Sequence, residues 1–304
     1  MKHNVNKIFC GVFAALLTPF NAKGAICETR LKQLVNFLLS KGINGFYVCG
    51  GTGEGPLMDV DERKHVVEIV KRTVGNKAAI IAHVGGTNNT RNAVSLARHA
   101  EQIGCDGVSS VFPGYYAYSF EEYFRYYKSL AECTQLPFFI YYNPHVGGGS
   151  SANKMAQFAK IRNIVGIKYT DYDLFSLQRL QQQINDKWIV FSGPDEFFLP
   201  ALTMGVVGSI GGTQNILPEV YIQIYKNFKA GNIQEAMRLQ RKITNVVSLL
   251  LTNGFIRSLK TVLRFRGLDG GCCRPPYLEK VSPEQERNMR KQWKELMPEY
   301  AENL

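Results

Sequence analysis

Short apolar runs alternate with amphipathic stretches for more than two hundred residues of this chain. Eight of the runs are rich in Val, Ile, Phe and Ala, which is typical of parallel strands buried on both faces. They lie near residues 12, 45, 78, 107, 137, 164, 188 and 206. The stretches between them, for example 28–42 and 90–104, place apolar residues at the spacing of a core-facing helix.

Eight strand–helix units predict an α/β fold, a (β/α)8 TIM barrel. A doubly wound open sheet also alternates strands and helices, but a count of eight favours the barrel. After about residue 218 the strand-like runs stop and helical periodicity continues. We therefore expect one domain over residues 1–304, with the barrel core in 1–217 and the last barrel helix plus C-terminal helices in 218–304.

Two helical segments carry finer signals. In residues 28–42 the apolar positions share one face of a helix; they are Leu31, Leu34, Val35, Leu38 and Leu39. Asp59 is followed three residues later by Glu62, which is the spacing of a capping box at a helix N-terminus.

The 304 residues carry a formal charge of +11, which raises the question of a polyanionic partner. The lysines and arginines are spread along the chain, and no nucleic-acid-binding motif is present. We expect no nucleic-acid partner, and a basic surface that attracts small anionic substrates.

The seven cysteines are odd in number and form no CxxC pair, which suits neither a disulfide framework nor a zinc site. Reduced thiols indicate a cytoplasmic protein, and no apolar run is long enough to span a bilayer. The five histidines show no metal-ligand spacing; His83 and His145 lie near strand ends, where core or rim positions are the ordinary explanation. We expect neither a bound metal nor a membrane partner.

Lys168 is the strongest candidate for chemistry because it ends a buried apolar strand, the run from Asn163 to Thr170. A lysine at this position is solvated, ion-paired, or held as a neutral amine by desolvation. A neutral amine at the mouth of a barrel is a nucleophile for carbonyl substrates. A lysine whose side chain only reaches solvent would give the same sequence pattern, so this pattern alone does not distinguish a solvated lysine from a nucleophilic amine.

Three further strand ends carry unusual residues. The glycine-rich turn Gly50–Glu54 can direct successive N–H groups at an anion, or form an ordinary tight turn. Its spacing matches neither GxGxxG nor GK[ST], so nucleotide binding is not predicted. Tyr141 and Tyr142 point to opposite faces of their strand, so one phenol lies inside the barrel, as a proton carrier or as core filling. Asp195 and Glu196 follow the seventh run, where they either accept hydrogen bonds from substrate hydroxyls or begin the next helix.

Seven segments occur together in a characteristic order: GGTGE, IAHVG, GYYAYSFEE, YYNP, GIKYT, SGPDE and LKTVL. In their order and spacing the chain resembles the N-acetylneuraminate lyase and dihydrodipicolinate synthase family, which are class I, Schiff-base pyruvate aldolases on a (β/α)8 barrel. The resemblance covers nearly the whole chain. IAHVG, GYYAYSFEE and the Asp–Glu pair resemble the sialate lyase branch in particular.

The resemblance implies a role for each matching residue. Lys168 would form an imine with the 2-keto group, and Tyr141, with Tyr142 as the alternative, would relay protons. Thr52 and Tyr115 would assist that phenol, Tyr115 from a neighbouring subunit. The residues implied to bind substrate are Gly51, Thr52, Thr170, Gly193, Asp195, Glu196 and Gly212. The resemblance also implies a homotetramer built from two dimers, and no cofactor, because the lysine itself supplies the electron sink.

Three positions depart from the patterns of the family. Gly51 stands where the family usually has Ser or Thr, and Gly212 where sialate lyases tend to have a serine near the polyol tail. Val146 stands where the lysine-biosynthesis branch has an arginine. These changes leave the aldolase chemistry intact but bear on the identity of the sugar acid.

The implied reaction is reversible cleavage of N-acetylneuraminate to N-acetylmannosamine and pyruvate. The alternatives are another pyruvate aldolase acting on a 2-keto-3-deoxy sugar acid, or dihydrodipicolinate synthase. A barrel that binds a keto acid only as a sensor is the alternative without catalysis.

Overall fold

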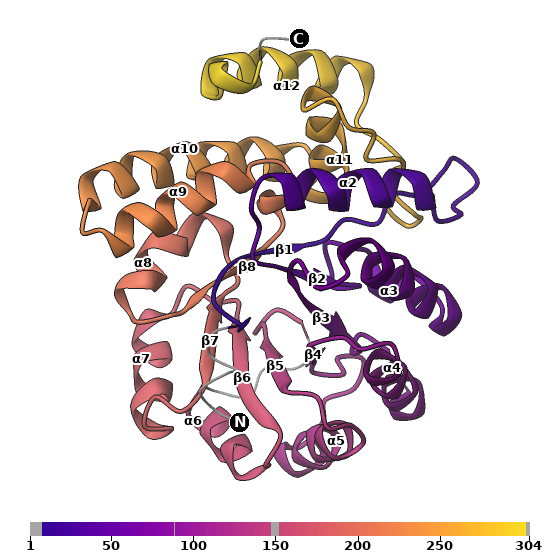
Figure 1. Ribbon diagram of the computed structural model, residues 1–304, viewed down its shortest axis with the longest axis vertical. Coiled ribbons are helices and arrows are strands. Elements are labelled where there is room, and N and C mark those ends of the chain that lie inside the picture. The colour runs from indigo at the N-terminus through magenta and orange to yellow at the C-terminus, as the bar shows by residue number, and fades with distance from the viewer. Residues whose placement is uncertain (1–7, 88, 147–151, 302–304) are drawn as a thin grey trace.

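The computed structural model describes residues 8–87, 89–146 and 152–301, and in them eight parallel strands close into a barrel (Figure 1). Each strand pairs with the next, and β1 pairs with β8 through Gly11 and Gly208. The strands are β1 (Gly11–Ala15), β2 (Gly45–Val48), β3 (Ala79–His83), β4 (Gly107–Val111), β5 (Phe138–Tyr142), β6 (Ile164–Tyr169), β7 (Ile189–Ser192) and β8 (Gly208–Gly211). The predicted barrel is confirmed. The single domain expected over 1–304 also includes residues 1–7, 88, 147–151 and 302–304, which lie outside the described residues.

Helices alternate with the strands and surround the barrel (Figure 1). They are α2 (Glu28–Ser40), α3 (Val60–Val74), α4 (Thr90–Gln102), α5 (Phe120–Glu132), α6 (Ala152–Met155), α7 (Leu174–Gln183), α8 (Phe198–Thr203) and α9 (Pro218–Lys229). Short 3-10 helices lie in several loops: η1 (Gly55–Leu57), η2 (Ala156–Lys160), η3 (Asp195–Phe197), η4 (Thr213–Asn215) and η5 (Pro298–Tyr300).

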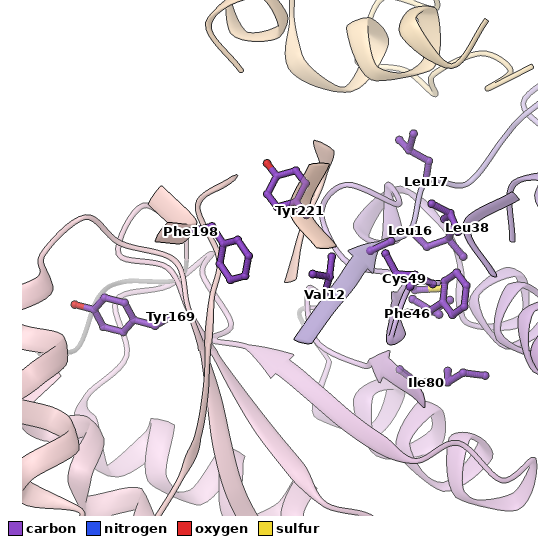
Figure 2. Packing of buried hydrophobic residues seen from close by; sticks show 14 of the residues in the cluster. Val12, Leu16, Leu17, Leu38, Phe46, Cys49, Ile80, Tyr169, Phe198 and Tyr221 are labelled. Carbon is purple, nitrogen blue, oxygen red and sulfur yellow. The ribbon is translucent and has the colours of Figure 1, made fainter. Parts of the chain in front are cut away.

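Two apolar layers account for the strand composition, because successive side chains point alternately into the barrel and toward the helices. In β1, Phe13 and Ala15 belong to the inner cluster, whereas Val12 and Ala14 belong to the outer one. Figure 2 shows part of the outer layer, where Val12 and Phe46 of the strands lie in the same cluster as Leu38 of α2. Strands buried on both faces therefore have near-continuous apolar runs, as the sequence pattern predicted.

The two helical signals in the sequence are also confirmed. Leu31, Leu34, Val35 and Leu38 are buried in α2, and Leu39 packs partly buried against the same core. Asp59 caps α3: its Oδ1 accepts from the N–H of Glu62 at 2.8 Å, and its own N–H donates to Glu62 Oε2 at 3.1 Å.

Three further helices follow α9: α10 (Ile233–Thr252), α11 (Phe255–Phe265) and α12 (Pro283–Leu296). In Figure 1, α12 lies beyond α10 and α11 on the side away from the barrel. In the described part of the chain, no helix by itself has the length and hydropathy to cross a bilayer; α10 and α11 reach them only as a pair bent by 118°.

Because all eight strands are parallel, their carboxyl ends meet at one mouth of the barrel. Tyr141 of β5 is paired in register with Lys168 of β6, which in turn is paired with Phe191 of β7. The loops that follow these strands are therefore neighbours, although they lie far apart in the sequence.

Candidate active site

A cavity of ≈ 400 Å³ lies at this mouth, between the carboxyl ends of the strands and helices α10 and α11. Eight of the ten residues singled out from the sequence line it: Thr52, Tyr141, Lys168, Thr170, Gly193, Asp195, Glu196 and Gly212. Gly51 and Tyr115 are not among the lining residues. The fold therefore gathers residues from five strand ends around one space.

Lys168 is only 6% exposed and lines the cavity. Its Nζ lies 4.3 Å from the ring centre of Tyr141 and 4.7 Å from that of Tyr47. Within the described residues it forms no ion pair, unlike the other buried lysine, Lys260. The amine is thus free of a carboxylate partner and open to a molecule in the cavity.

The two neighbouring tyrosines of β5 take opposite sides, as the strand alternation requires. Tyr141 lines the cavity beside Lys168, and its ring also lies 5.9 Å from that of His83. Tyr142 stacks on Tyr169 outside the barrel, with ring centres 5.1 Å apart. The phenol within reach of a reacting group is therefore that of Tyr141.

The glycine-rich turn after β2 leaves three consecutive N–H groups without an acceptor in the described residues: those of Gly51, Thr52 and Gly53. The turn is closed by bonds from the N–H of Glu54 to Gly51 O and from that of Gly55 to Gly50 O, both 3.0 Å. Consecutive free N–H groups in a turn favour an anion. Thr52 adds a side chain that lines the cavity, whereas Gly51 is exposed with open space where a side chain would project.

Asp195 is 5% exposed and is held by the segment that follows β8. Its Oδ2 accepts from the N–H of Gly212 at 3.1 Å and of Thr213 at 2.9 Å, and its Oδ1 has no partner in the described residues. Burial raises the pKa of Asp195 to about 7, against the opposing effect of the Thr213 N–H, while the neighbouring Glu196 raises it further. Near neutral pH this group can therefore act as donor or acceptor.

Glu196 and Thr170 complete the polar side of the cavity. The hydroxyl of Tyr172 donates to Glu196 Oε1. Thr170 Oγ1 is buried without a partner in the described residues, and Gly193 packs against it so closely that a Cβ there would lie 1.8 Å away. Only glycine at 193 leaves this hydroxyl in place, ready for a ligand.

An apolar side faces these groups, and the sequence did not single it out. Val247 and Leu251 of α10 and Phe255 of α11 line the cavity. A Cβ on Gly212 would lie 2.8 Å from Cε1 of Phe255, so the phenyl ring occupies the space that a larger residue at 212 would need. In the sequence these positions carry an ordinary helical pattern, and nothing in it marks them as facing a cavity.

Tyr115 lies apart from the cavity, in the loop after β4. Its side chain is 75% exposed, and its ring packs against that of Tyr116 with centres 4.8 Å apart. Within one chain it is therefore placed with other exposed aromatic groups rather than with Lys168.

His83 is a core residue beneath the site, while His145 lines the cavity. His83 Nδ1 lies 3.2 Å from Cys49 O, and its Nε2 accepts from the N–H of Val111 at 3.2 Å. Burial holds the pKa of His83 well below its usual range, and the charge of Arg63 lowers it further. Its bonds tie the ends of β2, β3 and β4 together.

Arg63 of α3 is buried, although the sequence around it resembles a solvated helix face. Its guanidinium donates to His83 O at 2.5 Å and to Gly85 O at 2.9 Å, so it holds the end of β3 from outside. Burial lowers the pKa of Arg63. No group of three or more His, Cys, Asp or Glu side chains in the described ranges is arranged to hold a metal ion.

A sequence model of the dihydrodipicolinate synthetase family matches residues 8–296. An N-acetylneuraminate lyase of Pasteurella multocida (strain Pm70) is 34% identical over 277 residues, which are 90% of this chain and 94% of the relative. One of Rhizobium meliloti (strain 1021) is 35% identical over 267 residues, 88% and 89% of the two chains. The crystal structure of CdNal from Clostridium difficile in complex with mannosamine has a TM-score of 0.90 and 31% identity, covering 96% of this chain and 99% of that one.

These matches extend over nearly the whole barrel and the helices that follow it, and they agree with the strand-end lysine and the closed eight-stranded architecture. The chain belongs to the dihydrodipicolinate synthetase family and is a class I pyruvate aldolase, a lyase that works through a Schiff base.

Proposed function

We propose that this chain is an N-acetylneuraminate lyase, which reversibly cleaves N-acetylneuraminate to N-acetylmannosamine and pyruvate. The observation that carries the proposal is the position of Lys168. Its amine faces a cavity that is lined by Thr52, from the turn with free N–H groups after β2, and by an acidic pair, Asp195 and Glu196, which follows β7. A keto acid with a hydroxylated tail has an anionic end and a polar end that match these two groups.

The reaction begins at the anionic end of the substrate. The N–H groups of Gly51, Thr52 and Gly53 hold the carboxylate, which places the C2 ketone beside Lys168. The neutral amine attacks C2, and loss of water gives a protonated imine. This cation accepts the electron pair of the C3–C4 bond as that bond breaks, so the products are an enamine and an aldehyde.

Tyr141 moves the protons of this cycle. Its phenol first gives a proton to the C2 hydroxyl that leaves as water, and the resulting phenolate takes the proton of the C4 hydroxyl as the C3–C4 bond breaks. The regenerated phenol then protonates C3 of the enamine, and hydrolysis of the imine, with the phenolate taking a proton from the attacking water, releases pyruvate and the amine. The ring of Tyr141 lies 4.3 Å from Lys168 Nζ, which is consistent with access to the atoms next to the imine. No cofactor takes part in these steps, because the imine nitrogen is the electron sink.

The polar end of the substrate meets Thr170, Asp195 and Glu196. Thr170 Oγ1 and Asp195 Oδ1 are buried oxygens without partners in the described residues, so a sugar hydroxyl can satisfy them. Gly193 contributes by leaving room for the threonine hydroxyl. Asp195 with a pKa of about 7 can accept from one hydroxyl or donate to another.

The proposal includes a cytoplasmic homotetramer, in which Tyr115 acts in the site of a neighbouring subunit. The support is that Tyr115 is 75% exposed and is not among the residues that line the cavity of its own chain. Tyr116, 64% exposed, extends the same aromatic surface. A second copy that covers this surface would bury both rings.

A second candidate is a pyruvate aldolase for another 2-keto-3-deoxy sugar acid, and it is favoured by Gly212. The phenyl ring of Phe255 lies where a hydroxyl-bearing side chain at 212 would project, so the far end of the cavity is less polar there. A substrate with a shorter or less hydroxylated tail suits such a surface.

Pyruvate release from a panel of 2-keto acids distinguishes the two candidates. The panel contains N-acetylneuraminate and a 2-keto-3-deoxy sugar acid without the acetamido group. We expect the highest kcat/KM with N-acetylneuraminate. Release from the second acid alone would replace the first candidate by the second, and release from neither would contradict both.

A further inference from the structure

Two residues in the segments GGTGE and LKTVL have no part in the chemistry above, yet they meet inside the protein. Glu54 ends the turn after β2, and Lys260 lies in the middle of α11. Their side chains are 0% and 2% exposed, and Lys260 Nζ lies 2.5 Å from Glu54 Oε1. A fully buried ion pair is costly to desolvate and is weak evidence for stability, so its position beside the turn that carries Thr52 points to a further role.

Lys260 uses all three N–H donors of its ammonium group. Besides Glu54, it donates to Thr18 O at 2.9 Å and to Cys272 O at 2.6 Å. The ring of Phe20 lies 4.8 Å from the same nitrogen. Three acceptors around one ammonium match its donor geometry.

This arrangement holds the turn from two sides. Glu54 is fixed directly, in a left-handed conformation with φ of 56°. Thr18 is fixed through its carbonyl, and its hydroxyl donates to Gly53 O at 2.8 Å. The three free N–H groups, those of Gly51–Gly53, directly precede Glu54. The last residue of the three, Gly53, is also held through its carbonyl by the Thr18 hydroxyl.

The C-terminal segment completes the arrangement. The second oxygen of Glu54, Oε2, accepts from the N–H of Arg274 at 2.8 Å. The Arg274 side chain pairs with Glu62 in α3 and donates through Nε to Gly24 O at 2.9 Å. Both oxygens of Glu54 are therefore held by residues more than two hundred positions away in the sequence.

Charge gives the pair a second effect. The N–H groups that would receive the substrate carboxylate directly precede Glu54, and an unpaired carboxylate there would repel a second anion through a medium of low dielectric. Lys260 neutralises Glu54 at close range. It thereby fixes the geometry of the anion-binding turn and keeps its potential favourable for an anion.

We propose that Glu54 and Lys260 are positioning residues for the keto-acid carboxylate, acting through the turn Gly51–Gly53. This inference rests on the proposed function, in which that turn binds the carboxylate. It assigns α11 a role in substrate affinity in addition to its place in the C-terminal helical region.

The test measures adduct formation on Lys168 after borohydride reduction, as a function of keto-acid concentration. Pyruvate is compared with methyl pyruvate, whose ester has the same ketone but no anion for the turn to bind. The variants are Lys260→Met, which leaves Glu54 unpaired, and Glu54→Gln combined with Lys260→Met, which removes both charges. The double variant has no unpaired buried carboxylate, so it is the variant to measure if Lys260→Met does not fold.

We expect Lys260→Met to raise the pyruvate concentration for half-maximal adduct by at least about tenfold, and the double variant by less, because it lacks the repulsion. The methyl pyruvate concentration for half-maximal adduct should change little in either variant. Met289→Ala is the matched control: Met289 is buried in α12, so its truncation lowers the melting temperature without touching the turn.

A purely structural role for the pair would change the pyruvate and methyl pyruvate values by the same factor, and that result would overturn the inference. The inference would also be overturned if the pyruvate concentration for half-maximal adduct in both variants equalled that of the wild type. If the wild-type protein forms no adduct with pyruvate, the proposed function fails and this inference fails with it. If the wild type forms the adduct and both variants form it at the same pyruvate concentration, only the inference fails.

Discussion

Asp195 has the clearest electrostatic signature among the cavity residues. Its carboxylate is buried, and two backbone N–H groups do not fully compensate the lost hydration, so its pKa rises from the ordinary 3.8 to about 7. Between these two values the folded state binds a proton that the unfolded state releases. The contribution of this group to the free energy of unfolding is therefore present at low pH and is lost as the pH rises to about 7.

Replacement of Asp195 by Asn tests this directly. The amide keeps an oxygen for the N–H groups of Gly212 and Thr213 but does not titrate. We predict that the stability of D195N relative to the wild type increases from about pH 5 to about pH 8 by at most about 3 kcal/mol, because the pKa shift spans only about two pH units of this range. Thermal unfolding of both proteins across this range provides the measurement. The other carboxylates are common to both proteins, so a difference that stays constant with pH would contradict a raised pKa.

Tyr141 and Tyr142 form a matched pair on opposite sides of one strand. We predict that Tyr141→Phe lowers kcat for pyruvate release by about a hundredfold to ten-thousandfold, because it removes the group that moves protons. Imine formation with pyruvate should persist in this variant, since the amine is unchanged.

Tyr142→Phe is the control for this pair, because its ring stacks on Tyr169 outside the barrel. Its kcat should remain close to that of the wild type. Equal losses in both variants would mean that the phenol of Tyr141 acts through packing rather than through proton transfer.

Among the elements, the turn between β2 and η1 shows how close packing and binding are combined. A Cβ on Gly55 would lie 1.8 Å from Cys49 O, a backbone atom that cannot move aside, whereas a Cβ on Gly51 would meet nothing within 4 Å. The two glycines therefore serve different purposes, although both belong to one short segment.

We predict that Gly55→Ala destabilises the protein by roughly 1–3 kcal/mol or more, as overpacking does, and raises KM for pyruvate in the synthetic direction. Gly51→Ser should leave the melting temperature nearly unchanged and lower this KM, because its hydroxyl would add a donor beside the free N–H groups. Calorimetry and initial rates check both variants. A destabilised G51S with a normal G55A would contradict the described turn.

The elements themselves followed from the sequence, because a strand buried on both faces must be apolar throughout and a helix on the barrel must be apolar on one side. Lys168 stood out for the same reason: a charge at the end of an apolar run is conspicuous. Pairings across the barrel were not predictable in this way. Glu54 and Lys260 are 206 positions apart, and their contact depends on the closure of the barrel and on the path of the chain after α11.

The burial of individual polar groups also could not be predicted from the sequence. Arg63 lies among charged residues of α3 and resembles a solvated position, yet its partners are carbonyls at the end of β3. Asp195 was expected at the rim, as a ligand for hydroxyls or at the start of a helix. In the structure its Oδ2 is used by the segment after β8, and only Oδ1 remains for a ligand.

At the scale of the whole molecule, the barrel and the C-terminal helices together line one cavity. The strand ends supply Lys168, Tyr141 and the acidic pair, and α10 and α11 supply the apolar side. The net charge of +11 adds a long-range attraction for an anionic keto acid. The reaction proposed for this cavity depends on a single bond, which forms between Lys168 Nζ and C2 of the substrate ketone.

Reduction of the protein with borohydride in the presence of pyruvate, followed by peptide mass analysis, tests that bond most directly. We predict one reduced pyruvate adduct on the peptide that carries Lys168, and its absence in Lys168→Ala. A wild-type protein without any adduct, or with an adduct on another lysine such as Lys260, would contradict the account.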